Sequence, residues 1–275
     1  MARIVHLGCG TMCPLGGPLV GARSWLERGR IVCHCLLVET DRDGLVLVET
    51  GFGTADCDDP SRLPRVFRAA AAPRLDREET AIAQIAGLGY DPRDVRNIVC
   101  THLDPDHAGG LSDFPWATVH VHRRERDDAV APPDARARTR YWKNRIAHGP
   151  TWAVYEPAGD TWMELPAVRR LDGMHHDIAL VPMIGHTRGH SAIAVRHGAR
   201  WLVHAGDAYF HRDELATPPR APLALRLFAT MDEVDRTARL ASVAALRRLR
   251  ARPDVDVVCA HDPVELDTAA AAAAP

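Results

Sequence analysis

The chain has 275 residues, with 34 lysines and arginines against 36 aspartates and glutamates, and its formal net charge is −2. This balance argues against a nucleic-acid partner, because such proteins usually carry a basic excess. No apolar run approaches the roughly 20 residues of a membrane span. The N-terminus also lacks the cationic segment and long apolar run of a signal peptide. We therefore expect a globular, cytoplasmic protein with no membrane partner.

The chain holds seven cysteines, and an odd number in a cytoplasmic protein argues against a disulfide framework. The tripeptide Cys33-His34-Cys35 has the residue types of a zinc site. In a strand, however, the two thiols lie on one face and the imidazole on the other, and the sequence has no matching Cys-x-x-Cys pair. We interpret these residues as buried thiols.

The first hundred residues alternate between strand and helix patterns, which indicates an α/β protein. Residues 8–17 form a glycine-rich segment, predicted as a loop, that matches no phosphate-binding fingerprint. The predicted strands are 3–7, 31–39, 45–49 and 98–100, and the predicted helices are 59–71 and 78–88.

The densest group of potential metal ligands follows the strand at 98–100. Four of them lie within six residues, namely His102, Asp104, Asp106 and His107. Alternation along an extended chain aims the first two to the same side. The turn imposed by Pro105 can bring the other two to a second point nearby, so one loop can serve two metal ions. The alternative is a polar surface turn, because Asp-Pro-Asp is a common turn composition.

The middle of the chain has a strand at 117–122, a charged helix start at 123–129 and an irregular insertion at about 132–165. His120 and His122 share one strand face, but no third ligand is evident nearby, and we interpret them as structural. The insertion is rich in proline and large aromatic residues, which either wall a substrate pocket or pack the insertion onto its own domain. Both interpretations of these aromatic residues stay open.

The remaining chain is predicted to contain a proline-rich loop at 216–224, a helix at 231–251 and an alanine-rich tail that is frayed from Ala269. Candidate ligands again follow strand patterns. His186 and His190 lie after one strand, Asp207 after another and His261 after the last. The predicted strands of this part are 168–171, 178–183, 192–195, 201–204 and 256–259.

The motif His102-x-Asp104-x-Asp106-His107 resembles the His-x-His-x-Asp-His signature of the metallo-β-lactamase superfamily, with Asp104 where most members carry histidine. The segments Gly-His-Thr-Arg-Gly-His at 185–190 and Gly-Asp at 206–207 are also similar to that family's motifs. The resemblance implies an α/β fold, a four-layer αββα sandwich of two mixed sheets flanked by helices. It further implies that residues 1–275 form a single domain.

The resemblance also implies a ligand set for two divalent metal ions. The first ion takes His102, Asp104 and His186, and the second takes Asp106, His107 and His261. Asp207 is expected to bridge the two ions.

Several neighbouring residues acquire roles by the same resemblance. Asp106 is expected to transfer a proton, and Tyr209 is a candidate phenol near the substrate carbonyl. Glu49 stands where the family usually reads Asp-Thr-Gly, so it either orients a ligand from behind or faces solvent at a strand end. His190 is expected to be structural, with a hydrogen bond to its loop.

Two cations lower the pKa of a shared water and polarise the group under attack. We therefore predict a metal-dependent hydrolase acting on a lactone, ester or related carbonyl substrate. A phosphodiester or organophosphate hydrolase is one alternative, and a di-iron oxidoreductase of flavodiiron type is another. Zinc is the favoured metal, while the carboxylate of Asp104 keeps manganese and iron open. The expected partner is a small-molecule substrate, and a homodimer is left open.

Overall fold

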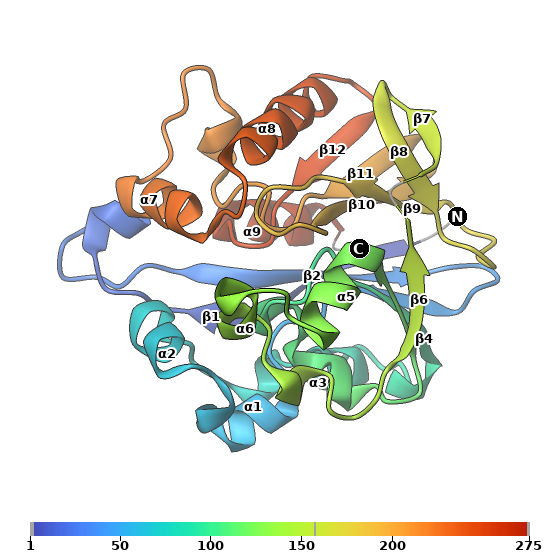
Figure 1. The fold of residues 1–275 in the computed structure, drawn as a ribbon, viewed down its shortest axis with the longest axis horizontal. Coiled ribbons are helices and arrows are strands. Elements are labelled where there is room, and N and C mark those ends of the chain that lie inside the picture. Colours follow the sequence, from blue (N-terminus) through green and yellow to red (C-terminus); the bar gives the residue numbers. More distant parts are fainter. Residues whose placement is uncertain (1–2, 157, 274–275) are drawn as a thin grey trace.

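The computed structural model describes residues 3–156 and 158–273, and its centre is a pair of six-stranded β-sheets (Figure 1). In the first sheet β1, β2 and β3 are antiparallel neighbours and β3 to β6 are parallel. Its strands, in spatial order, are β1 (Arg3–Met12), β2 (Ile31–Glu39), β3 (Leu45–Val48), β4 (Val95–Val99), β5 (Thr118–His122) and β6 (Thr151–Tyr155).

The second sheet is antiparallel except for its parallel pair β11 and β12. Both sheets are therefore mixed, as predicted. The strands of the second sheet, in spatial order, are β12 (Val255–Val258), β11 (Arg200–His204), β10 (Ser191–His197), β9 (Ile178–Pro182), β8 (Leu165–Arg170) and β7 (Asp160–Trp162).

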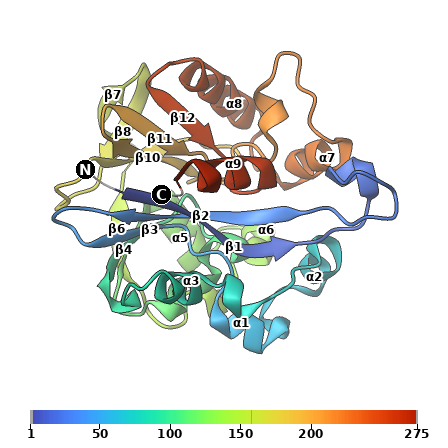
Figure 2. The same ribbon diagram turned by 180° about the vertical axis from the view of Figure 1, so that it is seen from behind.

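Helices α3, α5 and α6 cover the outer face of the first sheet and α8 covers that of the second, and Figure 2 shows the same layers from behind. None of the helices among the described residues is long and apolar enough to cross a membrane. The α-helices are α1 (Thr54–Asp58), α2 (Arg65–Ala71), α3 (Ala81–Gly87), α4 (Pro105–Ala108), α5 (Arg123–Val130), α6 (Ala135–Arg140), α7 (Leu223–Asp232), α8 (Arg236–Arg250) and α9 (Pro263–Ala273).

Strand β2 illustrates why this sequence forms a sandwich. Leu36 and Val38 pack between the two sheets, whereas Cys35 and Leu37 pack under the helices that cover the first sheet. A strand that is buried on both faces needs a continuous apolar run rather than alternation, and β2 has one. The second sheet is covered in the same way by α8, through residues such as Leu246. The predicted four-layer αββα sandwich is confirmed.

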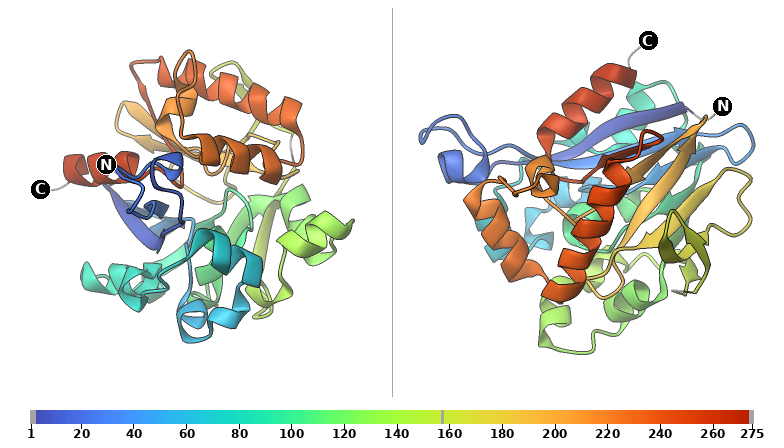
Figure 3. Two further views of the ribbon diagram at one scale, coloured as in Figure 1. Left: turned by 90° about the vertical axis from the view of Figure 1, so that its left-hand side faces the viewer. Right: turned by 90° about the horizontal axis from the view of Figure 1, so that it is seen from above.

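The first strand and the last helix of the chain lie side by side. Helix α9 packs against β1 and β2, and Figure 3 shows it alongside β1. The prediction of a frayed tail from Ala269 is wrong, because that segment belongs to α9. Residues 8–12, predicted as loop, extend β1, since they continue to pair with β2 across a bulge.

The helix predicted at 231–251 is two helices, because the chain is extended at Glu233 and Asp235. The side chain of Asp235 accepts a hydrogen bond from the amide of Ala238 and thereby caps α8. Helix α7 begins inside the proline-rich segment predicted as a loop.

The segment 132–165 is more regular than expected, and it supplies one strand to each sheet. Strand β6 pairs with β5, and β7 pairs with β8; Pro157 lies outside the described residues. Four of its large aromatic residues pack against the cores: Tyr141 and Trp152 under the first sheet, Tyr155 between the sheets, and Trp162 against Trp201. Trp142 is the exception and is exposed. The structure therefore supports the packing interpretation for these four residues.

Candidate metal centre

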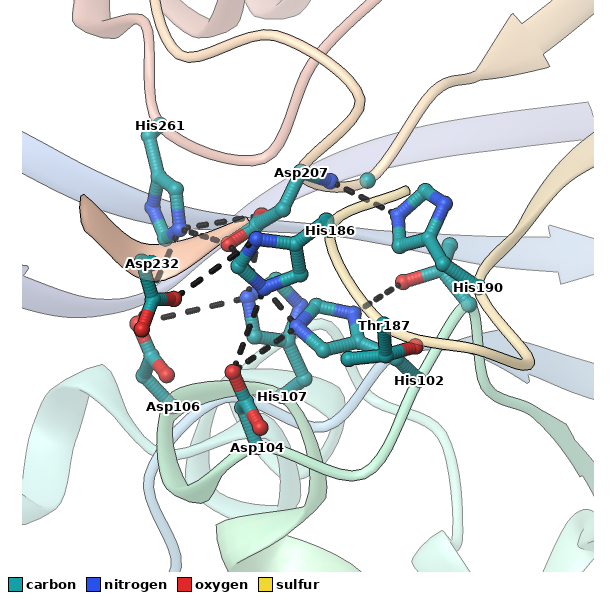
Figure 4. Close-up of polar contacts among 12 residues, drawn as sticks. His102, Asp104, Asp106, His107, His186, Thr187, His190, Asp207, Asp232 and His261 are labelled. Carbon is teal, nitrogen blue, oxygen red and sulfur yellow. Dashed lines mark hydrogen bonds and ion pairs between the residues drawn. The ribbon is translucent and has the colours of Figure 1, made fainter. Parts of the chain in front are cut away.

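The predicted ligands lie on loops at the ends of strands, and these loops converge at one edge of the sandwich (Figure 4). Parallel strands end at the same edge of a sheet, so β3 and β4 deliver their following loops together, as do β11 and β12. The loop after β4 and the short helix α4 carry four candidates, and the loops after β9, β11 and β12 carry one each. These residues are His102, Asp104, Asp106, His107, His186, Asp207 and His261.

Asp207 lies at the centre of the cluster. Its Oδ1 is 3.2 Å from Nε2 of His107 and 3.1 Å from Nε2 of His261. Its Oδ2 is 3.8 Å from Nε2 of His102 and 3.5 Å from Nε2 of His186, and His261 Nε2 is also within 3.2 Å of it. The carboxylate thus faces one histidine pair with each oxygen, as a bridging ligand does.

The other two aspartates divide between the histidine pairs. Asp104 Oδ2 is 3.5 Å from His102 Nε2 and 3.2 Å from His186 Nε2. Asp106 Oδ2 is 4.0 Å from His107 Nε2 and 3.6 Å from His261 Nε2. We call His102, Asp104 and His186 the first half-site, and Asp106, His107 and His261 the second half-site.

The protein holds three of the four imidazoles from behind. Nδ1 of His102 is 2.9 Å from the hydroxyl of Thr101, and Nδ1 of His107 is 2.9 Å from Oε2 of Glu49. Nδ1 of His261 is 2.8 Å from the main-chain carbonyl oxygen of Val32. Partners of this kind fix the ring orientation and leave Nε2 directed inward, as in protein metal sites.

Glu49 is buried and has a left-handed backbone, with φ of 63°. Its side chain contacts His107 through one oxygen and accepts a hydrogen bond from the amide of Thr101 through the other. A strained backbone persists only where the surroundings fix it, and such residues cluster at functional sites. The interpretation of Glu49 as a solvent-facing strand end is excluded, and the orienting role fits its contacts.

His190 supports the bridging aspartate from the other side. Its Nε2 accepts a hydrogen bond from the amide of Asp207 at 3.0 Å, and its Nδ1 donates to the carbonyl oxygen of Met183 at 2.9 Å. Burial lowers the pKa of His190 to about 3, so the neutral ring that this pairing needs is the stable form. Gly206, which precedes Asp207 in the chain, has φ of +53°. A Cβ at this position would lie 2.6 Å from Nε2 of His190, so only glycine fits.

Divalent cations fit this arrangement. Among the described residues, the buried atoms Nε2 of His102, Nε2 of His107 and Oδ1 of Asp207 have no hydrogen-bond partner. Leaving such atoms unpaired costs about 1–3 kcal/mol each, and a cation would satisfy all three. Imidazole nitrogens with carboxylate oxygens are donors that zinc accepts readily.

The electrostatics agree with an anionic bridge. Burial by itself raises the pKa of the Asp207 carboxyl, but His261, His107 and His102 outweigh that effect and hold its pKa well below the usual range. Burial likewise disfavours the charged form of His107, yet Asp207 and Glu49 raise its pKa well above normal. The surrounding histidines therefore keep the Asp207 carboxylate ionised, so negative charge is concentrated at the centre of the cluster.

Three residues that the sequence did not single out adjoin the ligands. Arg140 is 2.7 Å from Asp104, and Asp232 is 3.6 Å from Nδ1 of His186. The ring of Phe210 stacks on His261, with centroids 5.4 Å apart. The chain has many arginines, and position 232 fell inside a predicted continuous helix, so neither residue carried a signal. Only the position of Phe210 close behind the Gly-Asp motif pointed to the site.

Other predicted candidates lie elsewhere. The buried phenol of Tyr209 donates its hydrogen bond to Glu265 and packs in the core under α8, so the structure gives no support for its catalytic role. His120 contacts the hydroxyl of Tyr155, and His122 accepts a hydrogen bond from the amide of Arg124 in the first turn of α5. Both histidines are structural, as interpreted from the sequence.

Comparisons with known proteins identify the class. The chain belongs to the metallo-β-lactamase superfamily, whose family model matches residues 28–261, and it is a metallo-hydrolase of that fold. It is 43% identical over 263 residues to a Mycobacterium tuberculosis protein named “Probable metallo-hydrolase”, covering 95% of this chain and 80% of the relative. It is 31% identical over 195 residues to the N-acyl homoserine lactonase AttM of Agrobacterium fabrum, covering 70% and 67%.

Solved structures show the same fold. A variant of AiiA from B. thuringiensis, with N-decanoyl-L-homoserine bound at its active site, superposes with a TM-score of 0.72 at 19% identity and covers 97% of this chain and 95% of its own. AidC, described as a dizinc quorum-quenching lactonase with a product bound, has a TM-score of 0.59 at 17% identity, over 95% and 85% of the two chains.

Proposed function

We propose that this enzyme hydrolyses a lactone or a related carboxylic ester with two divalent cations, zinc in preference to manganese or iron. The observation that carries the proposal is the position of Asp207, which faces one histidine pair with each carboxylate oxygen. The lactonase AttM and the dizinc lactonase AidC support the substrate class and the metal. In this proposal residues 1–275 act as one domain.

The ligands assigned to each cation follow the half-sites. His102, His186 and Asp104 would hold the first, and His107, His261 and Asp106 the second. When bound, a pair of divalent cations supplies a hydroxide nucleophile at neutral pH and polarises the carbonyl oxygen under attack. The substrate is a small molecule, and a homodimer remains a prediction.

The protein's own residues then orient the groups and move the proton. Asp106 lies on the first turn of α4, beside His107. We assign it to take a proton from the nucleophile and pass it to the leaving oxygen of the substrate. Phe210 stacks on one ligand ring of the second half-site and meets His186 edge-on, so it excludes water from that side. Glu49, Thr101 and the neutral ring of His190 hold the ligand side chains in their orientations.

The competing functions find less support. A phosphodiester hydrolase would be favoured by free basic side chains, but Arg188 is paired with Asp128 and Asp134. A flavodiiron-type oxidoreductase finds less support because the similar proteins carry the names metallo-hydrolase and N-acyl homoserine lactonase.

The test is a substrate panel with zinc-loaded enzyme: N-acyl homoserine lactones, simple δ- and γ-lactones, p-nitrophenyl esters and bis(p-nitrophenyl) phosphate. We expect turnover of a lactone or carboxylic ester to exceed that of the phosphodiester by at least 100-fold in kcat/KM. Faster phosphodiester cleavage would replace the proposal with the phosphodiesterase alternative. Oxygen consumption by iron-loaded protein, without hydrolysis of any substrate, would favour the oxidoreductase.

A further inference from the structure

Arg140, the last residue of α6, reaches into the first half-site. Its side chain is 7% exposed, and its Nη1 lies 2.7 Å from Oδ2 of Asp104 and 3.0 Å from Nε2 of His186. Its Nη2 donates to the main-chain oxygen of Asp232 at 2.6 Å and lies 2.8 Å from that residue's carboxylate. A guanidinium with both terminal nitrogens engaged in this way is not free to bind a substrate anion.

The contact with His186 has a chemical consequence. A guanidinium has only donors, so its approach to Nε2 uses the lone pair of that nitrogen. The same lone pair would coordinate a cation in the first half-site. Arg140 also contacts Oδ2 of Asp104, the oxygen that faces His102 and His186. Arg140 and a metal ion would therefore bind the same two ligand atoms, Nε2 of His186 and Oδ2 of Asp104.

The charges explain why the arginine is held there. The first half-site contains Asp104, borders Asp232 and shares the bridging carboxylate, so it gathers three acidic groups. Arg140 supplies a positive charge to this group, with its Nη1 2.7 Å from Oδ2 of Asp104 and its Nη2 2.8 Å from the carboxylate of Asp232. Carboxylate and guanidinium stabilise each other in the absence of any other cation.

Among the described residues, no guanidinium or ammonium group contacts a ligand atom of the second half-site. The partners behind its two histidines are a carboxylate from Glu49 and a main-chain carbonyl oxygen. Neither group carries positive charge, and neither approaches Nε2. The departure from histidine at position 104 therefore comes together with an arginine that, in the described part of the chain, contacts the first half-site and not the second.

We infer that Arg140 competes with the metal ion of the first half-site, so that the two half-sites bind zinc with unequal affinity and fill in sequence, the second before the first. This inference rests on the dinuclear centre of the proposed function, and it concerns metal affinity rather than substrate. Occupation of the first half-site requires the guanidinium to leave Asp104 and His186 while its contacts with Asp232 persist.

The experiment is a zinc titration of metal-free, full-length protein against a chromogenic chelator, which counts the ions bound and gives both dissociation constants without any turnover. We expect the native protein to show two steps separated by at least tenfold. In Arg140→Met the weaker step should tighten by about tenfold or more, because a positive charge beside a dication is removed, while the tighter step changes less than threefold.

Arg136 provides the matched control. It lies one turn earlier on the same helix, and its guanidinium donates to the main-chain oxygen of Met231 rather than to a ligand. Arg136→Met should leave both steps unchanged. Arg140→Lys, which keeps the charge, should resemble the native protein, and circular dichroism should show that each variant is folded before it is titrated.

A double-mutant cycle gives a second, independent readout. Asp104→His restores the residue found in most of the superfamily but leaves Arg140 without its carboxylate, so the weaker step should weaken further. Asp104→His with Arg140→Met should recover it by at least tenfold. An unchanged or weakened first half-site in Arg140→Met would overturn the inference, because the arginine would then support metal binding. Failure of the native protein to bind any zinc would instead refute the dinuclear proposal itself.

Discussion

The two half-sites share Asp207 but differ in what lies behind and beside their histidines. In the second half-site, the ring of His107 is fixed by the buried carboxylate of Glu49. In the first, the ring of His102 is fixed by the neutral hydroxyl of Thr101, and a guanidinium lies against the ring of His186. The comparison teaches that one pattern of ligands can carry two different electrostatic environments, and it predicts that the half-sites respond differently to mutation.

The largest effect is expected where the half-sites meet. Asp207→Ala removes the oxygen atoms that face both histidine pairs, so both cations lose a ligand at once. We expect kcat for the best ester or lactone substrate to fall by about 1,000-fold or more, because the nucleophile depends on the cations. Steady-state kinetics with parallel measurement of bound zinc checks this. A variant that keeps two zinc ions and a tenth of the native activity would contradict a bridging role.

The next largest effect separates the half-sites. Glu49→Gln keeps the shape of the side chain but removes the charge behind His107, and we expect the tighter zinc step to weaken by about 10–100-fold, as for other residues behind metal ligands. Thr101→Val removes only a neutral hydrogen bond behind His102. It should weaken the other step by less than tenfold, because hydrogen bonds to charged groups are stronger. Equal losses at both steps would remove the difference between the half-sites.

A buried histidine outside both half-sites gives a reference for pH. Burial lowers the pKa of His120 to about 4, from 6.5 in the unfolded chain, so the unfolded chain binds the proton first as the pH falls. Stability is therefore fully present above pH 6.5 and is lost toward pH 4. Between pH 7.5 and pH 5 this residue should lower the free energy of unfolding by about 2 kcal/mol.

Thermal unfolding in EDTA measures that loss. His120→Gln should show a shallower fall of Tm over the same pH range than the native protein, by about 5 °C. The same slope in both proteins would mean that the pKa of His120 is not lowered by folding.

The smallest effect is expected at Tyr209. Tyr209→Phe removes the hydroxyl that donates to Glu265, at a cost of about 1 kcal/mol in the free energy of unfolding. It should change kcat by less than threefold, since that hydroxyl is engaged in the core under α8. A loss of kcat above 100-fold with unchanged stability would restore the catalytic role that its sequence position suggested.

The sandwich and the ligand positions could be predicted because local patterns carry the resemblance to the metallo-β-lactamase superfamily, and the resemblance implies both. Continuous apolar runs such as β2 indicate strands buried on both faces, and the motif from His102 to His107 follows such a run directly. Asp207 and His261 are likewise marked by the strands that precede them. Residue types and spacing mark these positions, and the resemblance to the family assigns their roles as ligands.

The surroundings of the site could not be predicted in this way. Arg140 approaches Asp104 from a helix 36 positions away, and Asp232 reaches His186 only because the chain breaks between α7 and α8. Strand β7 and helix α9 are stabilised by tertiary packing that composition does not reveal. The charge balance of the first half-site is therefore a property of the fold rather than of any motif.

The most direct test of the central claim is anomalous diffraction at the zinc edge from crystals grown with millimolar zinc. The account predicts two peaks, one beside each carboxylate oxygen of Asp207, at about 2.0–2.3 Å from the surrounding imidazole nitrogens and carboxylate oxygens. A single peak, or no peak beside Asp207 at saturating zinc, would contradict it.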